Sequence, residues 1–404
     1  MGAGTSVGKW RVLAFASLGH LVNDGWTAFI PVVADIAHVK GTPISVVALM
    51  SVAFYSAAAL FSFHIGRWAD RRGALGTLVG LGLGIVSLSF LGFFLALNLT
   101  TQSVLYASVV VLSSVAGFGT AFYHPLSATV IRSAFPYTES GKALGVSGAF
   151  GAVGSTAFPV VFVSLAVFLT QPNALALMSG IGLLSAVTVA AGLRERRRTA
   201  QIARDASRGD GSGLNRDVLV LTGVTAIRSL SSAGFTFWLA TYLTTVKGIG
   251  VGPLLGLTLA ALWIGSIPGQ FVFGAMVDRF DNRYVLGVGS GGAALCVLAY
   301  IYSPGYLGVV FIVLFGFFSF STFPTLLSLA SAYAPGASSS ANAIVWGLGA
   351  YGGNVVGPGL VGLVVGENYA LFNPAFAVLA VLGLVGAVVS PLMRKPERKR
   401  HGIR

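Results

Sequence analysis

The chain of 404 residues has few charged side chains and a single cysteine. Asp, Glu, Lys and Arg together make up 9% of it and hydrophobic residues 55%, whereas soluble domains carry about 25% charged residues. This deficit excludes an ordinary soluble domain and indicates a polytopic membrane protein. The single cysteine, Cys296, excludes an internal disulfide framework. The first apolar run is too long for the core of a signal peptide, so we expect no cleavable leader.

Long apolar runs are the main feature of what is present. A span of the bilayer needs about 20 apolar residues, and runs of that length recur along the whole chain. The 54 glycines suit helices that pack closely in lipid. We therefore predict an all-α polytopic membrane protein with twelve transmembrane helices and both termini on one side. The predicted spans are 10–37, 44–66, 74–97, 102–131, 141–170, 173–193, 218–246, 252–277, 284–303, 306–333, 339–365 and 370–393.

Basic residues fall almost entirely on one side of these spans. Of the 25 Lys and Arg, 22 lie on the side of the termini, Lys40 and Lys247 lie on the other, and Arg228 lies inside a span. Cytoplasmic loops carry the excess of Lys and Arg in membrane proteins. The pattern predicts a multi-pass protein of the cell membrane with both termini in the cytoplasm. It also explains the net charge of +13 without a nucleic-acid partner.

A polar, arginine-rich segment divides the spans into two sets of six. Residues 194–217 are predicted to form a basic cytoplasmic linker between an N-terminal half, 1–193, and a C-terminal half, 218–393, which is followed by a basic tail, 394–404. The two halves share features at fixed offsets, as expected for an internal repeat. Such repeats are typical of secondary transporters, whose halves rock about a site near the midplane. Pro125, Pro136 and Pro159 have counterparts 199 residues on at Pro324, Pro335 and Pro358.

The loop after the second span reads G-R-W-A-D-R-R-G over residues 66–73. It resembles the signature loop of the major facilitator superfamily, and a second, weaker copy follows the eighth span. The resemblance implies the fold of that superfamily, with two pseudo-symmetric six-helix halves, and a role for both loops in gating. The alternative is a solvated turn whose charges only set the topology. The gating candidates are Gly66, Asp70, Arg71, Gly73, Gly274, Asp278 and Arg279.

Three further stretches resemble the fosmidomycin-resistance branch of efflux proteins in the same superfamily. They read H-L-V-N-D-G at 20–25, F-Y-H-P at 122–125 and G-G-N-V-V-G-P at 352–358, and the last contains Asn354. This resemblance implies export of drug-like or small anionic compounds in exchange for protons. It also makes Asn354 a candidate for substrate binding.

A polar trio stands in the middle of the first span. His20, Asn23 and Asp24 have the spacing of one helix face. Acidic groups in hydrocarbon are costly and mark ion or substrate paths. We predict that Asp24 and His20 carry the coupling proton and that Asn23 contacts substrate. The alternative is a hydrogen-bonded trio that locks the first helix to a neighbour.

Two more polar residues lie deep in spans. His124 precedes Pro125, which removes a backbone donor and frees a carbonyl; His124 is either a substrate or proton site or is bonded to that backbone. Arg228 either pairs with Asp24 across the halves, binds an anionic substrate group or reaches the cytoplasmic interface. The aromatic candidates for the cavity wall are Trp26, Tyr123 and Trp346, although aromatic residues also serve packing and membrane interfaces.

The sequence therefore favours a proton-coupled exporter of small organic molecules. The runner-up is a proton-coupled symporter that imports a small organic anion such as a carboxylate or phosphonate. A passive channel or a receptor is disfavoured by the repeat, and an enzyme is less favoured still. The expected partners are a small-molecule substrate, protons and membrane lipid, and we expect a monomer. We expect no cofactor and no metal site, because the histidines lie on different spans without a cysteine or carboxylate set beside each.

Overall fold

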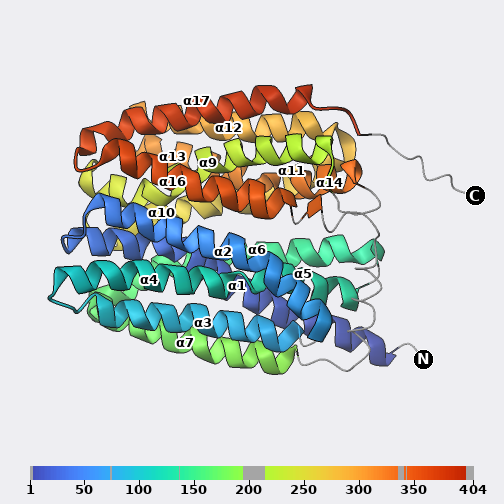
Figure 1. Cartoon of the computed structure of the whole chain (residues 1–404), viewed down its shortest axis with the longest axis horizontal. Helices are drawn as coiled ribbons and strands as arrows, with labels where there is room; N and C mark the ends of the chain where they lie inside the picture. The colour runs from blue at the N-terminus through green and yellow to red at the C-terminus, as the bar shows by residue number, and fades with distance from the viewer. Residues whose placement is uncertain are drawn as a thin grey trace, which may run out of the picture.

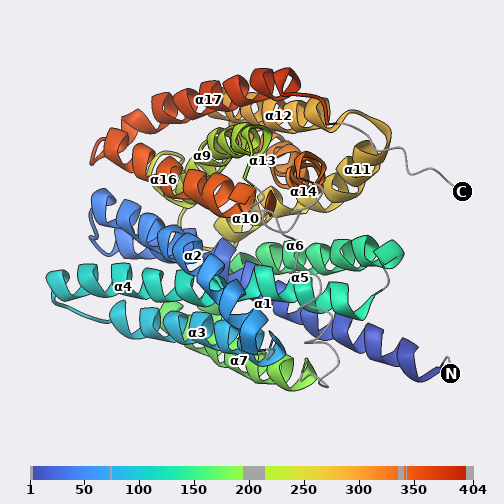
Figure 2. The same ribbon diagram turned by 45° about the vertical axis from the view of Figure 1, so that its right-hand side comes forward.

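The computed structural model describes residues 3–72, 75–135, 137–193, 214–334, 341–342 and 344–396. Every regular element within these ranges is a helix, which confirms the all-α prediction. The helices run roughly parallel in two bundles, one formed by α1 to α7 and the other by α9 to α17 (Figures 1 and 2). The predicted linker lies outside the described residues except for its last part, 214–217.

The N-terminal bundle contains six spans, of which the fourth is broken. Its prediction, 102–131, corresponds to α4 and α5, which are separated at Ala121 and Phe122. Pro125 follows the break and has no N–H to donate to the carbonyl of Ala121. The helices are α1 (Ala3–Val39), α2 (Ile44–Arg72), α3 (Leu75–Ala96), α4 (Gln102–Thr120), α5 (Tyr123–Ala134), α6 (Tyr137–Phe168) and α7 (Gln171–Gly192).

The C-terminal bundle repeats this break at the matching place. The tenth span separates at the short 3-10 turn η1, which is followed by Phe323 and then by Pro324, the counterpart of Pro125. The elements are α9 (Arg216–Thr245), α10 (Pro253–Ile264), α11 (Ser266–Arg279), α12 (Asn282–Tyr302), α13 (Gly305–Ser319), η1 (Phe320–Thr322), α14 (Phe323–Tyr333), the π-helix η2 (Val345–Tyr351), α16 (Gly352–Val365), η3 (Tyr369–Leu371) and α17 (Phe372–Leu392).

Eleven segments of the described chain are long and apolar enough to cross a membrane. The helix α1 is not among them, because His20, Asn23 and Asp24 lower the hydropathy of its centre. It has 37 residues, more than a span requires. Within the chain it packs along α6 and against α9. We count it as the twelfth span, the one with the most polar centre.

Glycines bring equivalent helices together in both halves. A Cβ on Gly154 of α6 would collide with the backbone of Leu21 in α1, and one on Gly353 would collide with the backbone of Ala226 in α9. Gly353 lies 199 residues after Gly154, so both halves use the same close approach. The middle of α1 thus approaches α6 closely enough for backbone contact at Gly154.

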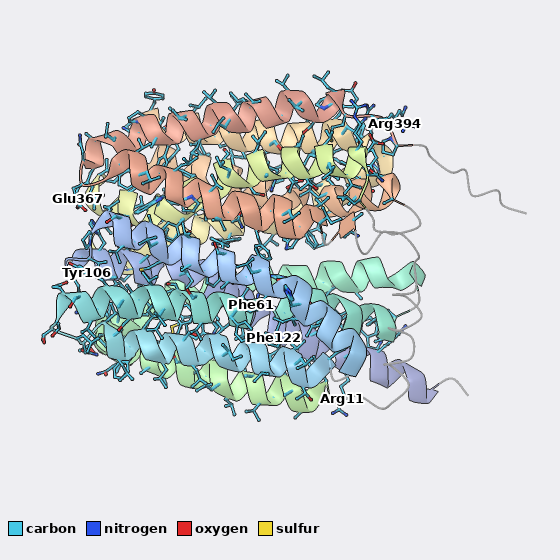
Figure 3. The ribbon with its side chains drawn as sticks, viewed as in Figure 1. Arg11, Phe61, Tyr106, Phe122, Glu367 and Arg394 are labelled. Carbon is cyan, nitrogen blue, oxygen red and sulfur yellow. The ribbon has the colours of Figure 1, made fainter. Side chains whose placement is uncertain are left out.

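The two ends of the bundle differ in their charges. The first turns of α1 and the end of α17 lie at the same end of the molecule (Figure 1). Arg11 and Arg394 lie at that end, whereas Tyr106 and Glu367 lie at the opposite one (Figure 3). The end opposite the termini is called the distal end below.

Candidate functional site

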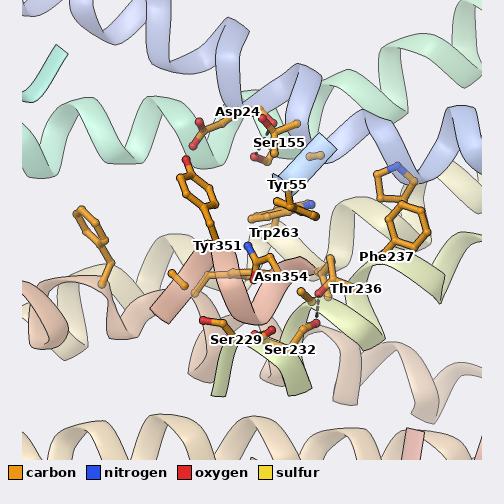
Figure 4. Close-up of a pocket in the computed structure, with 18 of the residues that line it drawn as sticks. Asp24, Tyr55, Ser155, Ser229, Ser232, Thr236, Phe237, Trp263, Tyr351 and Asn354 are labelled. Atoms are coloured by element: carbon orange, nitrogen blue, oxygen red, sulfur yellow. Dashed lines mark hydrogen bonds between the residues drawn. The ribbon is translucent and has the colours of Figure 1, made fainter. Parts of the chain in front are cut away.

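A cavity of about 230 Å³ lies between the two halves. Figure 4 shows Asp24 and Ser155 on one side facing Tyr351 and Asn354 on the other. The charged side chains among its lining residues are Asp24 and Arg228, one from each half. The further polar residues in the wall are Thr27, Tyr55, Thr120, His124, Ser155, Ser229, Ser232, Thr236, Trp263, Thr322, Trp346, Tyr351 and Asn354.

Asp24 is held between two histidines from different helices. His20 Nε2 lies 3.1 Å from Asp24 Oδ2, and His124 Nε2 lies 3.5 Å from Asp24 Oδ1. The amide of Asn23 donates to Asp24 Oδ1 over 3.0 Å. The three side chains of His20, Asp24 and His124 keep exposed fractions of 17%, 26% and 30%. We call these three residues the His–Asp–His cluster; its side chains are half-buried, and Asp24 and His124 line the cavity.

The break between α4 and α5 explains why His124 reaches this cluster. His124 is the second residue of α5, so its side chain leaves the chain where the span is interrupted. The sequence predicts no cluster of metal-ligating side chains, but one ligand atom from each cluster member lies within 4.8 Å of the others. The sequence hides this because His124 is 100 positions from Asp24.

Arg228 faces the same cavity but has other contacts. Its guanidinium donates to the carbonyl of Ser319, at the break before η1, and to Ser229 Oγ over 3.4 Å. Its buried Nε has no hydrogen-bond partner among the described residues. The ion pairs described for Asp24 go to the histidines. The Asp24–Arg228 pair considered from the sequence is therefore absent from the described contacts.

Two of the aromatic candidates do not line the cavity. The indole N–H of Trp26 donates to Ser87 Oγ over 3.1 Å, and its ring stacks on Phe90 with centroids 4.1 Å apart. Tyr123 is fully buried and donates to the carbonyl of Ala16 over 2.6 Å. The expectation that these two face substrate is wrong, because both are used in packing the N-terminal half.

The remaining binding candidates divide in the same way. Trp346 and Asn354 do line the cavity, as the sequence analysis expects. Asn23 is fully buried and lies outside the lining. It contacts Asp24 and lies 3.4 Å from His124 Nε2, so it positions the cluster rather than touching the cavity.

The side chains of most gating candidates lie outside the described part of the chain. Gly66, Asp70 and Arg71 belong to the last turns of α2, but their side chains lie outside the described residues, as does the whole of Gly73. Gly274 and Arg279 lie in α11, and Arg279 is exposed at its last position. The side chain of Asp278 lies outside the description. Their role in gating stays a prediction.

Several polar residues of the cavity wall are not predicted from the sequence. Phe235 of α9 is not among the lining residues and packs against Phe315 and Phe376. The polar stripe of α9 that meets the cavity is Ser229, Ser232 and Thr236. Its helical spacing of three and four residues was the available signal.

Three hydrogen bonds between described residues join the two halves at the distal end. Thr244 of α9 donates to Asp35 of α1 over 2.8 Å. Tyr369 and His38 Nε2 are 2.9 Å apart, and the backbone N–H of Ile44 donates to Glu367 over 3.1 Å. We call these three contacts the distal clasp. Asp35 is fully buried and its Oδ2 has no hydrogen-bond partner among the described residues. The sequence did not indicate that Asp35 is buried.

The chain matches a known protein family over most of its length. The profile described as Major Facilitator Superfamily matches residues 16–353 and 255–404. Among curated proteins, the chain is 24% identical over 119 residues to "Protein TsgA homolog" of Buchnera aphidicola subsp. Schizaphis graminum (strain Sg). That match spans 29% of this chain and 30% of the relative, so it carries no conclusion about the whole protein.

Solved transporters share the fold at low sequence identity. The nucleoside transporter NupG is similar with a TM-score of 0.74 at 14% identity, over 96% of this chain and all of that one. A D-xylose-proton symporter gives 0.73 at 14% identity, over 96% and 98% of the two chains. A bacterial homolog of the human lysosomal transporter Spinster, in an inward-facing and occupied conformation, gives 0.69 at 16% identity, over 96% and 97%. These structures share the fold of this chain, and the family match indicates a transporter rather than an enzyme.

Proposed function

The chain belongs to the Major Facilitator Superfamily, and on that premise we propose that it is a proton-coupled antiporter that exports small organic or drug-like molecules, including anions. The observation that carries the proposal is the position of Asp24. It lies in the wall of the cavity between the halves, in contact with two histidines. A carboxylate at that depth is costly unless it is used.

The cluster supplies the groups that proton coupling needs. Asp24 holds a proton when the cavity faces the side of higher proton concentration, and His20 and His124 share that proton through the contacts at 3.1 and 3.5 Å. Release on the other side restores the charge of the carboxylate. Because substrate enters the same cavity, its binding and the protonation of Asp24 affect each other, which is the energetic requirement for coupling.

The opposite wall supplies the substrate contacts. Arg228 has a planar guanidinium, suited to bidentate contact with a carboxylate or phosphonate, and its Nε is unpaired among the described residues. Asn354 and Trp346 lie in the same wall. The wall of the C-terminal half therefore binds the substrate while the N-terminal half handles the proton, and rocking of the halves couples the two.

The distal clasp belongs to one of the two states of such a cycle. Its three hydrogen bonds join the halves at the end opposite the termini. We place both termini in the cytoplasm because 22 of the 25 basic residues lie on their side. The state with an intact clasp is then closed to the outside, and the protein is a monomer of the cell membrane in which the loops at Asp70 and Asp278 form the inner gate.

A proton symporter that imports a small organic anion is the second candidate. A structural neighbour is described as a D-xylose-proton symporter, and the same cavity serves both directions. The direction depends on the order in which proton and substrate leave, which a fold shared at 14% identity does not set.

Proteoliposomes separate the two candidates. A thermal-shift screen of organic anions, cations and neutral drugs first provides a ligand, since a ligand that binds the folded state stabilises it. An antiporter accumulates that ligand when the lumen is acid, and a symporter accumulates it when the outside is acid. Accumulation that ignores the pH gradient in both orientations would refute proton coupling altogether.

A further inference from the structure

We propose that the His–Asp–His cluster binds one divalent transition-metal ion at the cavity wall. Its three ligand atoms, two imidazole nitrogens and one carboxylate oxygen, lie within 4.8 Å of one another. Two histidines and one carboxylate are a ligand set that suits Zn²⁺, Co²⁺ and Ni²⁺, whereas Mg²⁺ and Ca²⁺ prefer oxygen ligands alone. The cluster is assembled from α1 and α5, which lie far apart in sequence.

The surroundings orient these ligands as a metal site requires. His20 Nδ1 lies 3.1 Å from Ser147 Oγ of α6, which leaves Nε2 directed at Asp24. Histidines that bind metals are usually held by such a bond at the second ring nitrogen. The amide of Asn23 fixes the carboxylate from the other side over 3.0 Å. The rings of His20 and His124 are 5.5 Å apart and inclined at 75°, so both Nε2 atoms approach Asp24 without stacking.

A glycine leaves the space that the cluster occupies. A Cβ on Gly151 of α6 would lie 2.6 Å from His20 Cδ2, 2.7 Å from Asp24 Oδ2 and 2.9 Å from His20 Nε2. A side chain at this position would therefore force the His20 and Asp24 side chains out of their present arrangement. Gly148, one turn earlier on the same helix, has nothing within 4 Å of its Cβ position and offers a matched control.

Access to the site comes from the cavity. Asp24 and His124 line the cavity, so an ion held by three protein ligands keeps an open position there for water or an anionic group. The other charged side chain in the wall is Arg228, whose guanidinium is bonded to the carbonyl of Ser319. One carboxylate against a divalent ion leaves a net positive charge, which favours an anion at the open position.

Metal binding has a consequence for transport that rests on the proposed function. The ion would use the atoms assigned there to the proton, so micromolar Zn²⁺ would inhibit coupled transport. The binding itself rests only on the geometry of the cluster. The two proposals can therefore fail separately.

The test uses the purified full-length protein in detergent with ZnCl₂ or CoCl₂ alone at pH 7.5. We expect one Zn²⁺ per chain by calorimetry and visible absorption bands of Co²⁺ with nitrogen ligands. Asp24→Asn and His124→Gln should each weaken Zn²⁺ binding more than about 10-fold, the lower bound for the loss of a supporting contact at a metal site. His64→Gln, at a histidine bonded to the carbonyl of Leu60 in α2, should bind as the wild type does.

The pair Gly151→Ala and Gly148→Ala completes the test without touching a ligand atom. Gly151→Ala should weaken Zn²⁺ binding, and Gly148→Ala should not. Absence of Zn²⁺ binding by the wild type, or equal binding by the cluster variants and the His64 control, would overturn the proposal. If Zn²⁺ binds at the cluster while Asp24→Asn still couples transport to protons, the metal site stands and the proposed proton site is lost. The converse result removes only the metal site.

Discussion

Removal of one hydroxyl from the distal clasp should open the distal end of the protein. Thr244→Val deletes the donor to Asp35 and keeps the shape of the side chain. In the clasped state Asp35 is fully buried, and its Oδ2 already has no partner among the described residues. Without Thr244 the carboxylate would lose its 2.8 Å hydrogen bond in that state, whereas water reaches it once the halves separate.

The size of the effect follows from that single bond. A hydrogen bond to a charged group contributes about 1.5–3 kcal/mol. With about 1.4 kcal/mol for each factor of ten, the equilibrium between the clasped and the opened state shifts by about 10- to 100-fold towards opening. The two other bonds of the clasp remain in place, so the protein still folds and still closes.

Labelling of a cavity cysteine from outside measures this shift without a substrate. Thr236 lines the cavity and the native Cys296 is buried, so a membrane-impermeant maleimide added to intact cells reports on Thr236→Cys. We expect Thr244→Val to raise the labelling rate by about 10-fold or more. Thr245→Val is the control, because the Thr245 hydroxyl bonds to the carbonyl of Thr241 within α9. Equal rates in the two variants would refute the clasp.

Three further predictions concern other parts of the chain. Trp26→Phe loses the bond to Ser87, so it should lower the melting temperature in detergent and leave ligand affinity unchanged. Arg228→Gln should weaken binding of anionic ligands about 10-fold and spare neutral ones, measured by thermal shift against concentration. The Arg283 guanidinium holds the pKa of Asp281 below its usual range, so this pair stabilises the fold above about pH 4 and less as the pH falls. The melting temperatures of the wild type and Asp281→Asn should therefore differ at pH 7 and converge in acid.

The fold was predictable because the bilayer dictates it. Apolar runs of about 20 residues define the spans without any knowledge of tertiary contacts. The breaks within the spans were harder to predict from the sequence. The apolar runs 102–131 and 306–333 predict continuous spans. In the structure both are broken near Pro125 and Pro324, and the breaks bring His124 and Thr322 to the cavity.

The site was predictable only where polarity is rare. Asp24 and Arg228 are identifiable from the sequence because a charged side chain in the middle of a span is costly and rarely occurs without a function. Trp26 was misassigned because an aromatic side chain in a span serves packing as readily as recognition. The contact between Asp24 and His124 and the bond between Asp35 and Thr244 link residues more than 90 positions apart, so only the packing of the helices reveals them.

The most direct test of the central claim compares two modes of transport in Asp24→Asn. Proteoliposomes containing a ligand from the screen report exchange at equal pH, which needs no net proton movement, and accumulation driven by a pH gradient, which does. If Asp24 carries the coupling proton, Asp24→Asn retains exchange and loses gradient-driven accumulation. Accumulation by Asp24→Asn at the wild-type level, with the same dependence on the gradient, would contradict the account.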